Sequence, residues 1–311
     1  MRSICRQSDF WRLCTYLSAG SILFLFASLQ TFSQEFEGFT FEDLEVPYCG
    51  PRMTVGVEPH PFAGKYEPRV GASWLSEVDG LRLDIGTRVS LHSDTVKHRS
   101  TFDAGAEFFT WTRLRSEGGF KFPVESVDYD FGLYATARMM AFGGDGIVDS
   151  RLRIAHISAH RVDGDKEILR DPSVADVYSR EFVDISFGAS SNSYPLPVGR
   201  FYVGGLWLFH VIPDSLAGIT PYIGFDATID FTVDDPSDGR GWPGIRLGGE
   251  LRLNTEVGTT LETMLKLGLW IGGDESKGLM IEGGWYHGHS PFGPYYPEVA
   301  STAFVGFSLL R

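Results

Sequence analysis

The chain has 311 residues, of which 43% are hydrophobic and 14% aromatic, and it contains 37 glycines. Its formal net charge of −13 argues against a nucleic-acid partner, because phosphate binding requires a surplus of Lys and Arg. No long amphipathic helix pattern is evident, so this composition favours a single all-β domain. The mean hydropathy is near zero, which fits a soluble protein and also a transmembrane barrel.

The N-terminal region is predicted to be a secretory signal peptide covering residues 1–33. Three arginines occur in its first twelve residues, an apolar run covers 17–29, and small residues follow before residue 34. The apolar run is shorter than the roughly 18 residues that a spanning helix needs. Residues 34–66 contain several prolines and no regular period, and they are predicted to form a periplasmic strap.

From residue 67 to residue 311 the sequence alternates between apolar and polar residues, with the period of two typical of β-strands. In one such stretch, Leu81 and Leu83 alternate with Arg82 and Asp84. Runs of about ten residues with this pattern are typical of membrane strands. Twelve strands are predicted, near 68–77, 80–92, 101–114, 127–141, 149–161, 178–190, 199–211, 219–232, 243–254, 258–271, 277–288 and 299–310.

An even number of strands suits a transmembrane antiparallel β-barrel with both ends on the periplasmic side. If the first strand runs outward, the connections 114–127, 161–178 and 288–299 become long extracellular loops. A soluble β-sandwich is the alternative, because its strands also alternate. Charged residues on the predicted inner face favour the barrel, and they are expected to pair and close a narrow lumen. These residues are Arg82, Asp84, Arg88, Asp130, Arg138, Arg151, Arg153, Arg246, Glu250 and Arg252.

One predicted strand carries polar residues on the face that should meet lipid. His156, Ser158 and His160 share that face, which begins with apolar residues. The next strand carries Glu181, which is expected beside His156 because the two strands are antiparallel neighbours. Serine, histidine and a carboxylate in contact can act as nucleophile, base and orienting group in ester hydrolysis. The sequence therefore predicts Ser158, His156 and Glu181 as catalytic, the alternative being ordinary polar residues at the membrane interface.

This arrangement resembles the His-x-Ser strand of outer-membrane phospholipase A and of the lipid A deacylase barrels. In those enzymes the pair faces the bilayer, and a polar residue of the adjacent strand completes the triad. They commonly continue with asparagine after the serine, where this chain has Ala159 and His160. The resemblance implies a serine acyl-ester hydrolase that acts on membrane lipids.

A longer resemblance links the chain to the bacterial family known as domain of unknown function 1207. It extends from about Glu67 to the C-terminus, and the Gly-His-Ser-Pro block is its most specific part. Members are secreted proteins of expected outer-membrane location with no settled activity, so the resemblance implies fold and location but no reaction. The stretches that carry it are 155–160 followed by Gly164 and Asp165, Tyr178–Glu181, and Gly288–Tyr296.

Further candidates for binding lie in loops and at strand ends. Asp163 and Asp165 follow the His-x-Ser strand and offer oxygens to calcium, although Asp-Gly-Asp is also an ordinary loop sequence. His160, His289 and Ser290 are additional candidates, but their spacing does not define a metal site. The partners expected are outer-membrane lipid and a second copy of the chain as a homodimer.

Together these observations predict a β-barrel over residues 67–311, in the outer membrane of a Gram-negative bacterium. The hypothesis for its function is a lipid-facing serine esterase of phospholipase or lipid A deacylase type. The alternative is a barrel without enzymatic activity, acting as a narrow channel or as a structural or adhesive protein.

Overall fold

The computed structural model describes residues 60–310, apart from 78, 97–99, 118, 142–145, 162–177, 192–197, 215, 217, 231–243 and 272–277. The predicted signal peptide and residues 34–59 of the predicted strap lie outside the described residues, so both stay predictions. No helix in the described part of the chain is long and apolar enough to cross a membrane.

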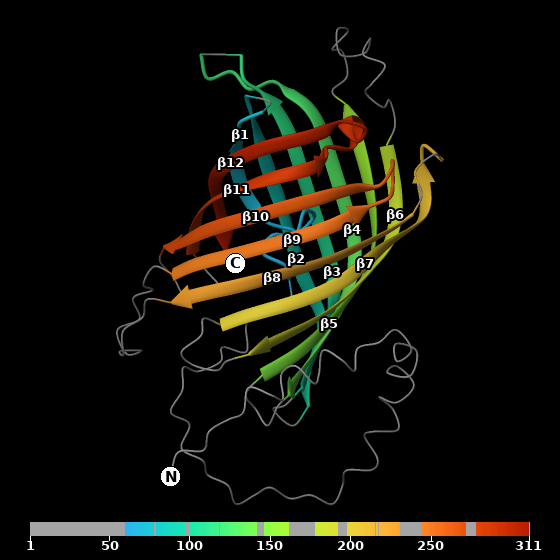
Figure 1. The fold of residues 1–311 in the computed structure, drawn as a ribbon, viewed down its shortest axis with the longest axis vertical. Coiled ribbons are helices and arrows are strands. Elements are labelled where there is room, and N and C mark those ends of the chain that lie inside the picture. Colours follow the sequence, from blue (N-terminus) through green and yellow to red (C-terminus); the bar gives the residue numbers. More distant parts are fainter. Residues whose placement is uncertain are drawn as a thin grey trace, which may run out of the picture. The chain divides into compact units, whose positions relative to one another are not determined.

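Twelve antiparallel strands form one sheet, as predicted. Each strand pairs with the next along the chain, and β12 pairs with β1, so the sheet closes into a barrel (Figure 1). The strands are β1 (Val70–Leu75), β2 (Gly80–Val96), β3 (Ser100–Arg115), β4 (Val124–Ala141), β5 (Gly146–Arg161), β6 (Tyr178–Ser191), β7 (Val198–Ile212), β8 (Ile219–Asp230), β9 (Gly244–Asn254), β10 (Thr260–Ile271), β11 (Gly278–His289) and β12 (Val299–Leu310).

The exposure of the side chains excludes a soluble sandwich. Leu83 and Ile85 on β2 are 38% and 49% exposed, whereas Arg82 and Asp84 are 5% and 1% exposed. Over much of their length the other strands likewise place large apolar side chains outside and charged side chains inside. A soluble protein has the opposite arrangement, with apolar side chains inside, so this exposure pattern suits a wall that is surrounded by lipid. The chain is therefore a transmembrane β-barrel.

Lengths of the connections do not distinguish the two ends of this barrel. Strand β8 ends and β9 begins at the end of the barrel opposite to the one where β5 ends and β6 begins, and the sequence between β8 and β9 is 231–243. It is longer than 116–123 and 290–298, which the sequence prediction counted among the long extracellular loops. The direction of the strands across the membrane therefore stays a prediction.

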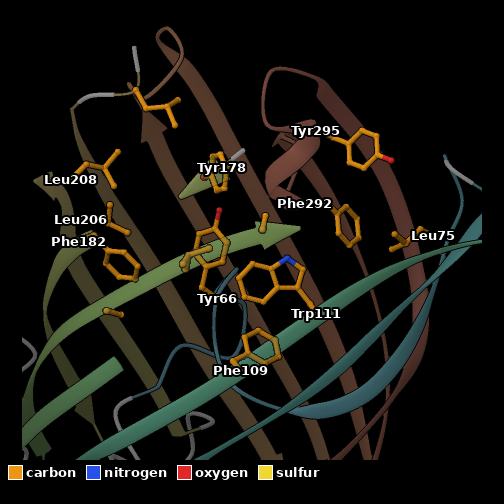
Figure 2. Packing of buried hydrophobic residues seen from close by; sticks show 14 residues of the cluster. Tyr66, Leu75, Phe109, Trp111, Tyr178, Phe182, Leu206, Leu208, Phe292 and Tyr295 are labelled. Carbon is orange, nitrogen blue, oxygen red and sulfur yellow. The ribbon is translucent and has the colours of Figure 1, made fainter. Parts of the chain in front are cut away.

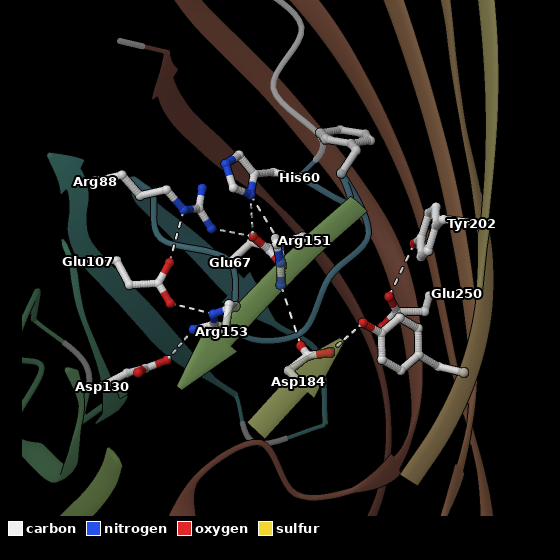
Figure 3. Close-up of polar contacts among 12 residues, drawn as sticks. His60, Glu67, Arg88, Glu107, Asp130, Arg151, Arg153, Asp184, Tyr202 and Glu250 are labelled. Atoms are coloured by element: carbon white, nitrogen blue, oxygen red, sulfur yellow. Dashed lines mark hydrogen bonds and ion pairs between the residues drawn. The ribbon is translucent and has the colours of Figure 1, made fainter. Parts of the chain in front are cut away.

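Inward-facing charges pair across the lumen, as predicted (Figure 3). Arg153 contacts Glu107 and donates through Nη2 to Asp130 at 3.0 Å. Arg200 makes a bidentate hydrogen bond to Asp149, through Nε at 2.8 Å and Nη2 at 2.7 Å. Such pairs add little net stability, but removing one partner leaves a buried charge without compensation and is strongly destabilising.

Residues 60–67 of the chain lie inside the barrel. The Phe62 amide donates to Asp226 on β8 at 2.8 Å, and Lys65 Nζ donates to Glu262 on β10 at 3.2 Å. Glu67 accepts from Arg151 on β5 at 2.7 Å. Contacts with three separate parts of the wall require a position in the lumen. This last part of the predicted periplasmic strap therefore runs within the barrel, because its side chains match inward-facing partners.

At the end where β5 stops and β6 starts, the lumen is filled by apolar side chains around Tyr66 (Figure 2). The connection after β11, which includes the short 3-10 helix η4 (Gly293–Tyr295), folds inward into this cluster. Trp111 Nε1 donates to the Pro291 carbonyl at 2.9 Å, and the Gly293 amide donates to Asp128 at 2.7 Å. The loop after β11 therefore reaches across the lumen to β3 and β4.

Gly293 of this loop has no space for a side chain. A Cβ atom there would lie 2.4 Å from the Ala159 Cβ and 2.5 Å from the Tyr178 ring. We expect Gly293→Val to destabilise the barrel by about 1–3 kcal/mol through overpacking, measured by urea unfolding in lipid vesicles. Gly205→Val is the matched control, because no atom lies within 4 Å of its added Cβ. Equal effects of the two changes would contradict this account.

Candidate active site

The two faces of strand β5 exchange their apolar and polar character along the strand. As far as Ile154 the apolar face is the outer one: Ile154 faces outward and is 50% exposed, while Arg153 faces the lumen and is 2% exposed. In its second half Ile157 points inward and is 1% exposed, and His156 and Ser158 lie on the outer wall. The inner face becomes apolar there because it packs against the apolar cluster of the lumen.

The pairing of β5 with β6 places the predicted triad residues together on the outer wall. His156 lies directly opposite Glu181, and Ser158 lies opposite Ser179. His156 Nδ1 is 3.4 Å from Glu181 Oε1. In the described part of the chain, no hydrogen bond joins Ser158 to the His156 ring. Since Nδ1 faces the carboxylate, Nε2 is the ring nitrogen that remains free to act as a base.

His210 on β7 joins this row and was missed by the sequence reasoning. Its Nδ1 is 2.8 Å from Glu181 Oε2, so one carboxylate lies between two imidazole rings. Leu206 and Leu208 point inward, and strict alternation would send His210 inward too. A β-bulge shifts the register where Glu181 pairs with His210, and it turns this side chain outward. The only signal in the sequence was a histidine in an apolar strand.

Aromatic side chains flank the polar row on both sides. On β4, Tyr129 lies opposite Ser158 and Phe131 lies opposite His156. On β7, Trp207 and Phe209 are 53% and 49% exposed on the outer surface. Aromatic side chains of membrane barrels gather at the level of the lipid headgroups. The flanking aromatic side chains are therefore those expected of a row at the headgroup level.

The remaining predicted candidates do not join the row as one site. His160 faces outward and makes an edge contact with Tyr129, with ring centroids 5.9 Å apart. His289 and Ser290 are each 7% exposed and belong to the interior, where His289 Nε2 is 3.1 Å from Thr260 Oγ1. Asp163 and Asp165 lie outside the described residues. Among the residues that are described, no three metal-ligating side chains form a group.

Fold and site together define an outer-membrane type of β-barrel with a histidine and serine row on its lipid-facing wall. Similar folds include the outer membrane phospholipase of Salmonella typhi, solved as a dimer with bound calcium, at 12% identity and a TM-score of 0.52. That match covers 84% of this chain and 94% of the other. An active-site mutant of outer membrane phospholipase A from Escherichia coli is 13% identical, with a TM-score of 0.51, covering 82% and 95% of the two chains.

These likenesses show the fold alone, because the sequence identities are low. No protein-family model matches the chain, so the resemblance to domain of unknown function 1207 is not confirmed. No curated protein matches the sequence. The predicted resemblance to outer-membrane phospholipase A is confirmed as a resemblance of fold.

Proposed function

We propose that the chain is an outer-membrane serine hydrolase that cleaves acyl esters of membrane lipids in a Gram-negative bacterium. The observation that carries the proposal is the outward-facing contact between His156 and Glu181 beside Ser158. A lipid ester can approach this row from the membrane without entering the barrel. The outer-membrane location and the strand direction, with β5 ending at the outer leaflet, belong to the same proposal.

In the proposed reaction, Ser158 Oγ attacks the ester carbonyl carbon while His156 Nε2 takes the hydroxyl proton. The tetrahedral intermediate then loses the lipid alcohol, which receives that proton from His156. Water attacks the acyl-serine, again with His156 as base, and the fatty acid leaves as Ser158 regains its proton. Glu181 holds the ring with Nδ1–H toward the carboxylate and stabilises the imidazolium.

The oxyanion needs a hydrogen-bond donor on the outer face. The Ala159 side chain, which follows the serine, is 4% exposed and points into the lumen. Ser179 lies on the outer face directly opposite Ser158, and directly paired residues have Cβ atoms about 4.5–5.5 Å apart. Its hydroxyl is the donor that we assign to this role.

Paired charges and the inward-folded segments occupy much of the described lumen, which favours the hydrolase over the narrow-channel alternative. A structural or adhesive barrel needs no hydrolytic row, so a chemical test separates it from the proposal. That test is hydrolysis of phospholipid and of lipopolysaccharide acyl esters by the detergent-folded protein, with and without calcium.

The same preparation is treated with an alkyl fluorophosphonate, and the modified peptide is located by mass spectrometry. We expect acyl release, its loss on treatment, and one adduct on Ser158. A protein that releases no fatty acid under any condition, or that is inactivated through another residue, would refute the proposal.

A further inference from the structure

A separate cavity of about 250 Å³ lies inside the barrel, on the side formed by β1, β10, β11 and β12. Apolar side chains make up much of its lining, including Leu75, Met264, Phe292 and Phe304. Basic side chains also line it, among them Arg82. This cavity is on the opposite face of the wall from the proposed active site, so it needs its own explanation.

Two guanidinium groups beside this cavity hydrogen-bond to the same carboxylate. Arg69 Nε and Arg82 Nε both donate to Asp84, at 2.6 and 2.7 Å. The nearby Lys266 has its own partner, Glu282, at 2.8 Å. The carboxylate of Asp84 is therefore divided between two guanidinium groups, which leaves donors of each free to bind another acceptor.

Arg82 also has an unused donor. Its side chain is 6% exposed, and its buried Nη2 has no hydrogen-bond partner among the described residues. Its guanidinium carbon lies 5.7 Å from the Trp111 ring, which offers the charge a π face but no acceptor. Buried guanidinium nitrogens normally bind an acceptor, so the unused nitrogen points to a missing anionic group.

We propose that this cavity binds a small amphiphilic carboxylate. The carboxylate accepts a hydrogen bond from Arg82 Nη2–H, and an unbranched apolar chain packs against Leu75, Met264 and Phe304. Glu77 and Glu298 also line the cavity, so the anionic group binds beside Arg82 and away from these two carboxylates. Because one water occupies about 30 Å³ in the liquid, the cavity holds a ligand of about eight non-hydrogen atoms.

Hexanoate has this size, and its binding to the full-length protein in nanodiscs can be measured by isothermal titration calorimetry. Hexanol tests the contribution of the alkyl chain without the charge, and inorganic phosphate and chloride test the contribution of the charge without the alkyl chain. We expect hexanoate to bind at least about tenfold more tightly than each of these. Hexanol lacks the charged hydrogen-bond acceptor, and the inorganic ions lack the apolar chain that contacts the cavity wall.

Two variants remove the site in different ways. Arg82→Met is expected to weaken hexanoate binding by about tenfold or more, and Ala300→Leu, which fills the cavity and keeps every charge, is expected to abolish it. Arg115→Met removes an exposed positive charge outside the cavity and should leave binding unchanged. If Arg82→Met does not fold, as judged by heat-modifiable mobility, Ala300→Leu decides. Hexanoate binding no tighter than that of hexanol or phosphate, or binding that survives Ala300→Leu, would overturn the proposal.

Discussion

Replacing Ser158 by alanine is expected to lower kcat for lipid ester hydrolysis by about 10⁶-fold, and His156→Ala by a similar factor. Both residues act in one proton transfer, so the double variant should be no slower than either single variant. The measurement is fatty-acid release from phospholipid by detergent-folded protein, with barrel folding checked by heat-modifiable mobility. Activity that persists in Ser158→Ala would mean that the outer row is an interfacial feature, and additive losses would mean that the two residues do not act in one proton transfer.

A substitution of Glu181 tests the part of the mechanism in which a carboxylate orients the His156 ring. Glu181→Ala is expected to lower kcat by about 10⁴-fold with KM nearly unchanged, because the carboxylate holds His156 and does not bind the lipid. His210→Ala is the matched control: it removes the other ring on the same carboxylate, at 2.8 Å, and leaves the pair with His156 in place. We expect it to lower kcat far less. A rise in KM with constant kcat in Glu181→Ala would assign Glu181 to lipid binding instead.

The alternation of residues was enough to predict the barrel and the facing of its strands. Lipid outside and paired charges inside impose a period of two, which Leu83 and Arg82 display on β2 and Ile154 and Arg153 on β5. The same rule correctly placed His156 on the outer wall, and antiparallel pairing put Glu181 opposite it. These features depend only on local periodicity and on neighbouring strands.

Features that depend on distant parts of the wall could not be predicted in this way. His210 faces outward because of a bulge, and a bulge leaves no mark in the alternation itself. Residues 60–66 have no period, and their place in the lumen follows only from partners such as Asp226 and Glu262. The inward fold of the loop after β11 rests on the fit of Gly293 between β4, β5 and β6, which appears only once the barrel has closed.

Glu67 is a buried carboxylate whose removal should strongly destabilise the barrel. It contacts Arg88 and accepts from Arg151 Nη1 at 2.7 Å, with His60 Nδ1 at 3.7 Å (Figure 3). Glu67→Ala leaves two buried guanidinium groups short of a partner, so we expect a loss of about 3–5 kcal/mol in urea unfolding. Glu117→Ala is the matched control, because its pair with Arg115 is exposed and should contribute no more than about 1 kcal/mol.

The effect of Glu67 should also depend on pH. Burial alone would raise the pKa of Glu67, but Arg151 and Arg88 outweigh it and hold the pKa well below its usual range. The carboxylate therefore stabilises the fold fully above its unfolded pKa of about 4.3, and this contribution falls as the pH drops toward the lower folded pKa. The stability difference between wild type and Glu67→Ala should be constant from pH 8 to about pH 5 and shrink below about pH 4. A difference that stays constant down to pH 3 would show that Glu67 acts through packing, since its charge would then contribute nothing to the barrel.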